Sequence, residues 1–203
     1  MNAMHLASIF FTMILVDNYV LVKFLGICPF LGVSKKLDSA VGMSLAVTFV
    51  MVLATAATWP IQTFLLTPES GAWDLGYLQT IVFILIIAIL VQLLENILKK
   101  FIPALYKALG VYPPLITTNC TILGVTVLNI DNGYNFLESI VCAAGAGLGF
   151  LVAMVLFSGV RRKVEEAVTP KCFEGLPITL VAAAVTSLSF MGFGGIIESI
   201  FGA

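Results

Sequence analysis

The chain has 203 residues, of which 60% are hydrophobic and only 10% are charged, and its mean hydropathy is +1.10. A soluble domain carries about 25% charged and about 45–50% apolar residues, so this composition argues against a soluble enzyme and against a disordered chain. The 10 basic residues nearly balance the 11 acidic ones, which argues against a nucleic-acid-binding protein. We therefore expect an all-α integral membrane protein surrounded by lipid.

Six apolar stretches meet or approach the length of about 20 residues that a helix needs to cross a bilayer. They are Leu6–Val33, Val41–Leu66, Tyr77–Leu98, Ala108–Val127, Phe136–Val160 and Leu176–Phe201. Together they occupy most of the chain, so no soluble domain fits between them. The first stretch has no basic segment before it and no clear cleavage site, and we expect it to be a retained span.

The basic residues predict how these six transmembrane helices are oriented. Nine of the ten lie in alternate connections, namely Lys35, Lys36, Lys99, Lys100, Lys107, Arg161, Arg162, Lys163 and Lys171. The other two connections, residues 67–76 and 128–135, contain no Lys or Arg. Because cytoplasmic loops are enriched in Lys and Arg, we predict that the basic loops are cytoplasmic and that both termini lie outside.

A repeated motif divides the chain into two halves. Residues 28–34 and 120–126 both read Cys-x-x-Leu-Gly-Val-Ser/Thr, at an offset of 92 residues. The first copy lies in the first span and the second in the fourth, which predicts three spans in each half, residues 1–98 and 99–203. Since three is odd, the second half enters the membrane from the opposite side, as in an inverted-topology repeat.

Both motif-bearing spans contain residues that interrupt helices, so we expect broken or re-entrant first and fourth spans. The interrupting residues are Asp17, Asn18, Lys23, Gly26, Pro29 and Gly32 in the first span, and Gly110, Pro113, Pro114, Asn119 and Gly124 in the fourth. Broken spans at matching places in two halves indicate a site near the middle of the membrane. Distances along the chain allow Cys28 and Cys120 to converge there.

Two converging cysteines are compatible with several chemistries. A single buried cysteine is usually a small packing residue, but a symmetric pair can form a disulfide for thiol–quinone exchange, pass a soft metal ion or hold an iron–sulfur cluster. A cluster normally needs four protein thiolates, so a second protein chain would have to supply two. An inverted-repeat secondary transporter and a membrane thiol–disulfide redox protein are the alternative functions, and spacing alone does not choose among them.

Three segments carry a resemblance to a known family. Asp17–Lys36, which contains Leu-Gly-Ile-Cys-Pro-Phe-Leu-Gly-Val, resembles the A subunits of Rnf electron-transport complexes, as do Pro114–Cys120 and Phe190–Phe193. The related E subunits of sodium-pumping NADH:quinone reductases share this organisation of the chain. The resemblance extends over nearly the whole chain, and it implies one component of a prokaryotic inner-membrane complex that moves electrons between ferredoxin and NAD⁺ and translocates Na⁺ or H⁺.

The resemblance also implies a cofactor and a partner. A paralogous Rnf E subunit of opposite orientation would pair with this chain, and two cysteines from each would hold a [2Fe–2S] cluster in the membrane. Here the ligands would be Cys28 and Cys120, with Gly26, Thr118 and Asn119 around the cluster. The cluster would relay electrons between a cytoplasmic iron–sulfur protein and flavins on the outer side, so the chain would be a subunit of an enzyme and not an enzyme alone.

Other patterns predict what the chain does not bind and which residues could contact ions. Residues 70–73 read Ser-Gly-Ala-Trp, which lacks the threonine that accepts flavin in partner subunits, so we expect no covalent flavin. No Gly-x-Gly-x-x-Gly segment is present, so we expect no NAD site. Ionisable residues inside a membrane are functional candidates, and Asp17 and Lys23 are therefore a hypothesis for part of an ion pathway.

Overall fold

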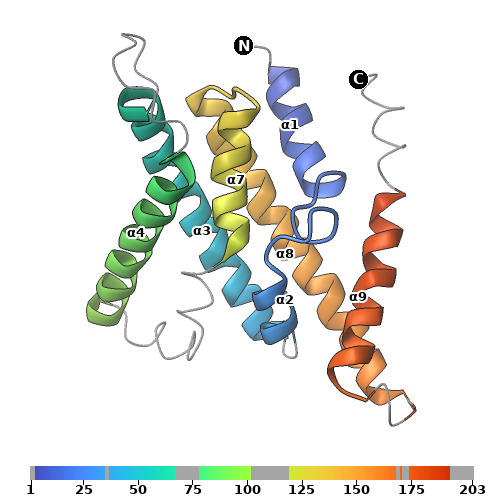
Figure 1. Cartoon of the computed structure of the whole chain (residues 1–203). Helices are drawn as coiled ribbons and strands as arrows, with labels where there is room; N and C mark the ends of the chain where they lie inside the picture. Colours follow the sequence, from blue (N-terminus) through green and yellow to red (C-terminus); the bar gives the residue numbers. More distant parts are fainter. Residues whose placement is uncertain are drawn as a thin grey trace.

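The computed structural model describes residues 3–34, 37–66, 78–101, 119–167, 170 and 174–192, and every regular element among them is helical (Figure 1). The helices are α1 (Ala3–Leu15), α2 (Ile27–Val33), α3 (Leu37–Ile61), α4 (Gln79–Phe101), α7 (Cys120–Asp131), α8 (Phe136–Glu166) and α9 (Leu176–Met191). A short π-helical segment, η1 (Gln62–Leu66), continues α3. The all-α prediction is thus confirmed for the described part of the chain.

Three of these helices are long and apolar enough to cross a membrane. They are Leu37–Phe64, Gln79–Ile97 and Phe136–Glu166, and three shorter apolar helices accompany them, at His5–Leu15, Cys120–Asp131 and Leu176–Met191. The long helices match the second, third and fifth predicted spans. The parts of the fourth span before Asn119 and of the sixth span after Gly192 lie outside the described residues, so the number of six spans stays a prediction.

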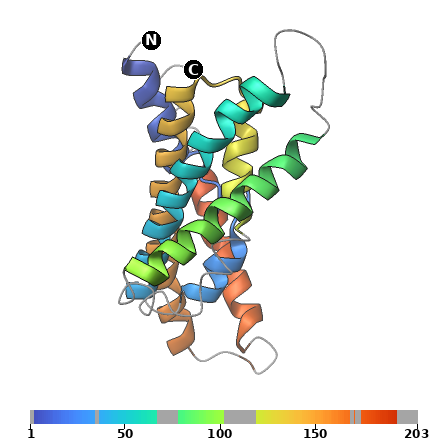
Figure 2. The same ribbon diagram turned by 90° about the vertical axis from the view of Figure 1, so that its left-hand side faces the viewer.

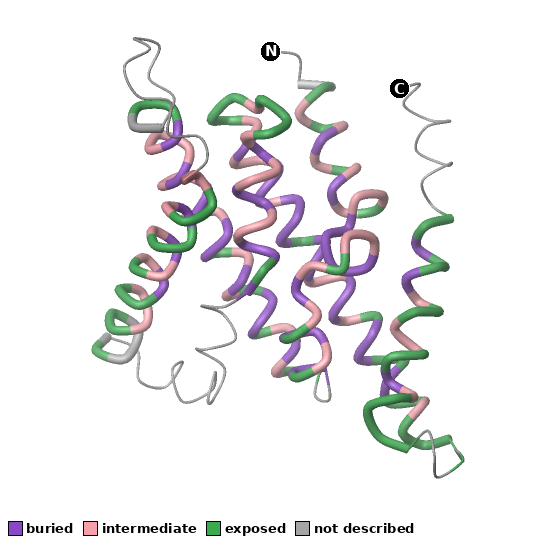
Figure 3. Tube along the Cα trace, viewed as in Figure 1, coloured by how far each residue is buried: buried purple, intermediate pink, exposed green. Residues whose placement is uncertain are grey.

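The centre of the molecule is the contact of α8 with α3 and α1. At Gly147 of α8, an added Cβ would lie 2.5 Å from the side chain of Thr48 of α3. At Gly149 an added Cβ would lie 2.9 Å from the carbonyl oxygen of Met13 of α1. Small residues allow helices in membranes to approach this closely. Figure 3 shows α8 as the buried centre of the bundle, whereas α4 exposes most of its outer face.

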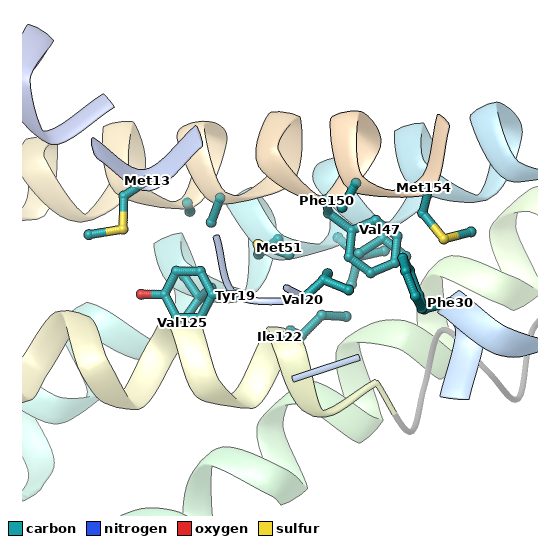
Figure 4. Close-up of a cluster of buried hydrophobic side chains, with 14 of the residues drawn as sticks. Met13, Tyr19, Val20, Phe30, Val47, Met51, Ile122, Val125, Phe150 and Met154 are labelled. Carbon is teal, nitrogen blue, oxygen red and sulfur yellow. The ribbon is translucent and has the colours of Figure 1, made fainter. Parts of the chain in front are cut away.

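The predicted interruption of the first apolar stretch is present between α1 and α2, where residues 16–26 are not helical. We call residues 16–26 the unwound segment. Its side chains Tyr19, Val20 and Leu21 are 2–3% exposed. Figure 4 shows Tyr19 and Val20 beside α7, which carries Ile122 and Val125. Protein therefore covers this non-helical backbone, which is the condition for tolerating it at membrane depth.

Asn18 supplies hydrogen bonds that a helix would otherwise provide to this backbone. Its Nδ2 donates to the carbonyl oxygen of Gly149 at 2.8 Å, and its Oδ1 accepts from the N–H groups of Val20 at 3.0 Å and Leu21 at 3.3 Å. The Ser187 hydroxyl of α9 donates to the Leu21 carbonyl. Asn18 is fully buried, so each of these bonds replaces one that water cannot make.

The two short helices that follow the motif cysteines lead away from the middle of the molecule in opposite directions. Figure 1 shows α7 running toward the end where α1 begins, and α2 running toward the other end, where α8 finishes. A long helix follows each of them after a short connection, α3 after α2 and α8 after α7. The order of elements after the two motif cysteines is therefore the same.

The described basic residues of α4 and α8 lie at one end of the molecule. The last parts of α4 and α8, which carry Lys100 and Arg161–Lys163, point toward the same end (Figures 1 and 2). The connection between α7 and α8, with Asp131 and Glu138, lies at the opposite end. Glu138 also closes the start of α8, because its Oε2 accepts a hydrogen bond from the N–H group of Asn135 at 3.0 Å.

Replacing Asn18 with alanine tests whether one side chain holds the unwound segment together. Asn18→Ala leaves the Gly149 carbonyl and the amide groups of Val20 and Leu21 buried without this partner. Unmade buried hydrogen bonds are costly, and we expect the free energy of unfolding to fall by about 2–3 kcal/mol. The measurement is the midpoint of thermal unfolding of the purified chain in detergent.

Asn132→Ala is the matched control, because Asn132 lies exposed in the connection after α7. We expect its unfolding midpoint to stay close to that of the unchanged chain. Equal midpoints for both variants would contradict the role given to Asn18.

Candidate metal centre

Cys28 and Cys120 are both free and exposed, and each lies at the start of a helix. Cys120 is the first residue of α7, and Cys28 is the second residue of α2. The residues before the helices are not helical. Gly26 has a left-handed φ of 85°, and Asn119 is extended. The chain therefore turns sharply into each short helix just where a motif cysteine stands.

A direct hydrogen bond joins the two motifs. The N–H group of Gly26 donates to the sulfur of Cys120 across 2.9 Å, although the two residues are 94 positions apart. This bond places Cys120 against the residue that precedes α2, while the convergence of the Cys28 and Cys120 sulfurs stays a prediction. Backbone N–H donors to sulfur tune the reduction potential of a metal–thiolate centre.

The close approach at Gly26 leaves no room for a side chain. A Cβ there would lie 2.2 Å from Thr121 Oγ1 and 3.2 Å from Asn119 Oδ1. A second close contact lies one turn further along α7, where a Cβ at Gly124 would stand 2.5 Å from Leu25 Cδ1. Glycine at position 26 thus satisfies both a left-handed backbone and contact with the second motif.

The start of α7 offers further polar groups beside Cys120. Asn119 Oδ1 accepts from the N–H group of Thr121 at 3.1 Å, which caps the helix. Asn119 Nδ2 and Thr121 Oγ1 are buried and have no partner within the described part of the chain. The N-terminus of a helix carries a partial positive charge. The start of α7 therefore presents these two polar groups and a partial positive charge beside Cys120.

The described residues offer the two motif cysteines and no larger ligand set. Among them, no three His, Cys, Asp or Glu side chains lie close enough to hold a metal ion. Cys142 is fully buried in α8, in agreement with a packing role, while Cys172 and Thr118 lie outside the described residues. Two exposed thiols, one of which accepts a hydrogen bond from an N–H group, fit half of a four-thiolate centre.

The two ionisable residues of the unwound segment are partners of each other. Lys23 Nζ lies 3.8 Å from Asp17 Oδ1, and the side chains are 30% and 40% exposed. The same Nζ lies 4.9 Å from the centre of the Tyr19 ring, a distance typical of cation–π contacts. The sequence left the partner of Asp17 open, and the structure identifies it as Lys23.

The helix that contains Arg161 is longer than the predicted fifth span. That span ends at Val160, whereas α8 continues to Glu166, so Arg161 lies on the helix. Arg161 is 6% exposed and donates to the Leu31 carbonyl and to Ser34 Oγ, at the end of α2. A local signal for the longer helix was the spacing of Arg161 and Glu165, which are four positions apart and pair at 3.1 Å.

Substituting Gly26 tests the contact between the two motifs. Gly26→Ala places a methyl group against Thr121 and forces alanine into the left-handed region, which costs about 1–2 kcal/mol by itself. We expect a lower unfolding midpoint and several-fold faster alkylation of Cys120 by a maleimide, because the clash with Thr121 separates the start of α7 from the unwound segment and leaves the sulfur more accessible. Mass spectrometry of the purified chain measures the alkylation of each cysteine.

Gly42→Ala provides the control, because an added Cβ at this position of α3 has nothing within 4 Å. We expect it to leave both the unfolding midpoint and the alkylation of Cys120 unchanged. If Gly26→Ala behaved in the same way, the motifs would not depend on this contact.

Comparison with known proteins shows the family to which the chain is similar. The family model described as "Rnf-Nqr subunit, membrane protein" matches residues 6–197. The A subunit of the Na⁺-translocating ferredoxin:NAD⁺ oxidoreductase complex of Acetobacterium woodii is 57% identical over 95% of this chain and 98% of its own length. The A subunits of the ion-translocating oxidoreductase complexes of Syntrophotalea carbinolica and Serratia proteamaculans are 52% and 53% identical, each over 91% of this chain and over 93% and 94% of their own lengths.

These matches cover both motif cysteines, the unwound segment and most of every described helix. The resemblance to Rnf A subunits drawn from the sequence is confirmed. The relatives are subunits of complexes that are named as ion-translocating oxidoreductases. The chain belongs to the Rnf-Nqr family of membrane proteins.

Proposed function

We propose that this chain is an electron-carrying membrane component of an ion-translocating ferredoxin:NAD⁺ oxidoreductase, and that it holds half of an intramembrane [2Fe–2S] cluster. The observation that supports the cluster most is the hydrogen bond from the Gly26 N–H group to Cys120 Sγ. It brings the two halves of the chain together at a cysteine. The relatives, which are A subunits of such complexes, support the placement in a redox complex.

Cys28 and Cys120 are the proposed ligands, and the groups around them suit that role. The Gly26 N–H group already points at a ligand sulfur, and the Asn119 amide beside it has a donor that no other described residue uses. Thr118 precedes Asn119 in sequence and is proposed to belong to the same surroundings. When bound, a [2Fe–2S] cluster supplies a carrier for one electron, and hydrogen bonds to its sulfurs tune its potential.

The exposure of both cysteines supports a shared site. Thiols on the surface of one chain can reach a centre that a second chain completes. The proposed second chain is the paralogous Rnf E subunit, which would contribute its own two cysteines from the opposite orientation, and other Rnf subunits would join this pair. Flavin and NAD chemistry is proposed to reside on those other subunits.

We further propose an inverted repeat of two halves, 1–98 and 99–203, in a prokaryotic inner membrane. The opposite directions of α2 and α7, and the long helix that follows each, support the repeat (Figure 1). The gathering of Lys100 and Arg161–Lys163 at one end supports a cytoplasmic position for that end. Both termini would then lie outside.

The Asp17–Lys23 pair stays our hypothesis for a part of the ion pathway in this chain. Both side chains are partly exposed and lie in non-helical backbone near the middle of the bundle. A paired acid and base can exchange with a passing cation more readily than a buried, fully bonded pair.

Iron analysis of cysteine variants tests the proposed cluster. The chain is purified without oxygen together with its paralogous partner, and iron, acid-labile sulfide and the EPR spectrum of the reduced sample are measured. We expect about two irons per pair of subunits, as a [2Fe–2S] cluster requires. Cys28→Ser and Cys120→Ser should each lose the iron and the signal.

Cys142→Ser serves as the control, because Cys142 is fully buried in α8 and lies outside the proposed ligand set. It should keep the iron and the signal of the unchanged pair. A well-folded pair without iron would overturn the cluster, and titration of Cys28 and Cys120 as a dithiol would then favour a thiol–disulfide protein. Binding of a small solute by a colourless pair would favour a transporter.

Labelling of introduced cysteines tests the proposed orientation. In a chain whose four native cysteines are replaced with alanine, Asp131→Cys and Lys163→Cys place single thiols on exposed residues at opposite ends. In cells whose outer membrane is permeabilised and whose inner membrane is intact, a membrane-impermeant maleimide should modify position 131 at once. It should modify position 163 only after the inner membrane is permeabilised. The reverse pattern would contradict the orientation.

A further inference from the structure

Arg161 is a buried cation, and neither the motifs nor the proposed ligand set explains it. It lies in the last part of α8, and its side chain is 7% exposed. Burying a charge is costly unless partners replace the lost water. A chain with only 10 basic residues therefore keeps one of them inside the protein, where it must be fully paired.

The partners of this guanidinium belong to the end of the helix that carries Cys28. Nη1 donates to the carbonyl oxygen of Leu31 and to Ser34 Oγ at 2.8 Å, and the Ser34 side chain is fully buried. The last carbonyl groups of a helix have no partner within the helix, and a cation there is favourable. Arg161 therefore closes the C-terminal end of α2.

This closed end lies near the cysteine. Leu31 follows Cys28 by three residues, which is about 4.5 Å along a helix axis. The positive charge therefore lies at the end of α2, about one turn of helix beyond Cys28. Glu165 Oε1 accepts from Arg161 Nε at 3.1 Å, but Glu165 is 51% exposed, so solvent screens its charge more than that of the arginine.

The neighbouring basic residues do not share this position. Arg162 and Lys163 are 83% and 85% exposed and pair with Glu166. A separate apolar contact also joins the same two helices, since the rings of Phe30 and Phe157 stack with centres 4.2 Å apart. The docking of α2 on α8 therefore does not rest on Arg161 alone.

We propose that Arg161 is a positioning residue for Cys28, which fixes the end of α2 and whose buried positive charge raises the reduction potential of the centre at Cys28. The second part rests on the proposed function, because it needs the cluster. Reduction adds an electron to a centre that four thiolates already make negative. A nearby cation therefore stabilises the reduced form more than the oxidised form.

The reduction potential of the purified pair of subunits tests the charge. Arg161→Gln should lower the midpoint potential in an EPR-monitored redox titration, whereas Arg161→Lys should keep most of it. Glu165→Gln should move the potential in the opposite direction and by less, because Glu165 is half-exposed. Arg162→Gln removes the same charge from an exposed neighbour and should leave the potential unchanged.

Opposite shifts for Arg161→Gln and Glu165→Gln are the expected signature of charge, because damage to the fold would move both variants in the same direction. If Arg161→Gln does not yield folded protein, Glu165→Gln still decides the matter by the direction of its shift. Shifts of equal sign, or no shift in any variant, would overturn the role of the charge.

Thiol labelling of the chain without a cluster tests the positioning, and it does not depend on iron. With α2 released from Arg161, a maleimide should alkylate Cys28 several-fold faster in Arg161→Gln and in Arg161→Lys, while the rate at Cys120 stays unchanged. Equal rates at Cys28 in all variants would overturn the positioning role. If the pair of subunits held no iron, the proposed function would fail. The labelling rates would still test whether Arg161 positions Cys28.

Discussion

The hydrogen bond from the Gly26 N–H group to Cys120 Sγ is the contact on which the rest of this structure depends. It lies where two non-helical turns meet, and it joins residues 94 positions apart. Membrane-depth backbone that is not helical must find every hydrogen bond inside the protein. The Asn18 side chain makes hydrogen bonds that hold the unwound segment on the side of α8. The Gly26–Cys120 hydrogen bond holds it on the side of α7.

From this contact the two short helices run apart, each starting at a motif cysteine (Figure 1). Their starts present N–H groups and partial positive charge to the middle of the bundle, while their sulfurs remain exposed. Such a surface is suited to a negatively charged centre that a second chain completes. The packing of α8 against α3 and α1 through small residues keeps the surrounding helices fixed.

The sequence predicted the features that leave a local signature, and missed those that arise between distant segments. The repeated motif and the interrupting residues near Asn18 predicted the break after α1, because helix-breaking residues act on their own backbone. The predicted fifth span ends at Val160, six residues before the end of α8, because charged residues usually mark the end of a span. No local pattern predicts that Arg161 donates a hydrogen bond to the carbonyl group of Leu31, 130 positions away. The count of six spans and the inverted repeat remain predictions.

The shared cluster is best tested by measuring iron in this chain alone and in the chain purified with its paralogous partner, both reconstituted with iron and sulfide without oxygen. We expect no stable cluster in the single chain, which offers two cysteines as ligands, and about two irons per pair of subunits, because a [2Fe–2S] cluster requires four thiolates. A full complement of iron in the single chain, or none in a well-folded pair, would contradict a shared cluster.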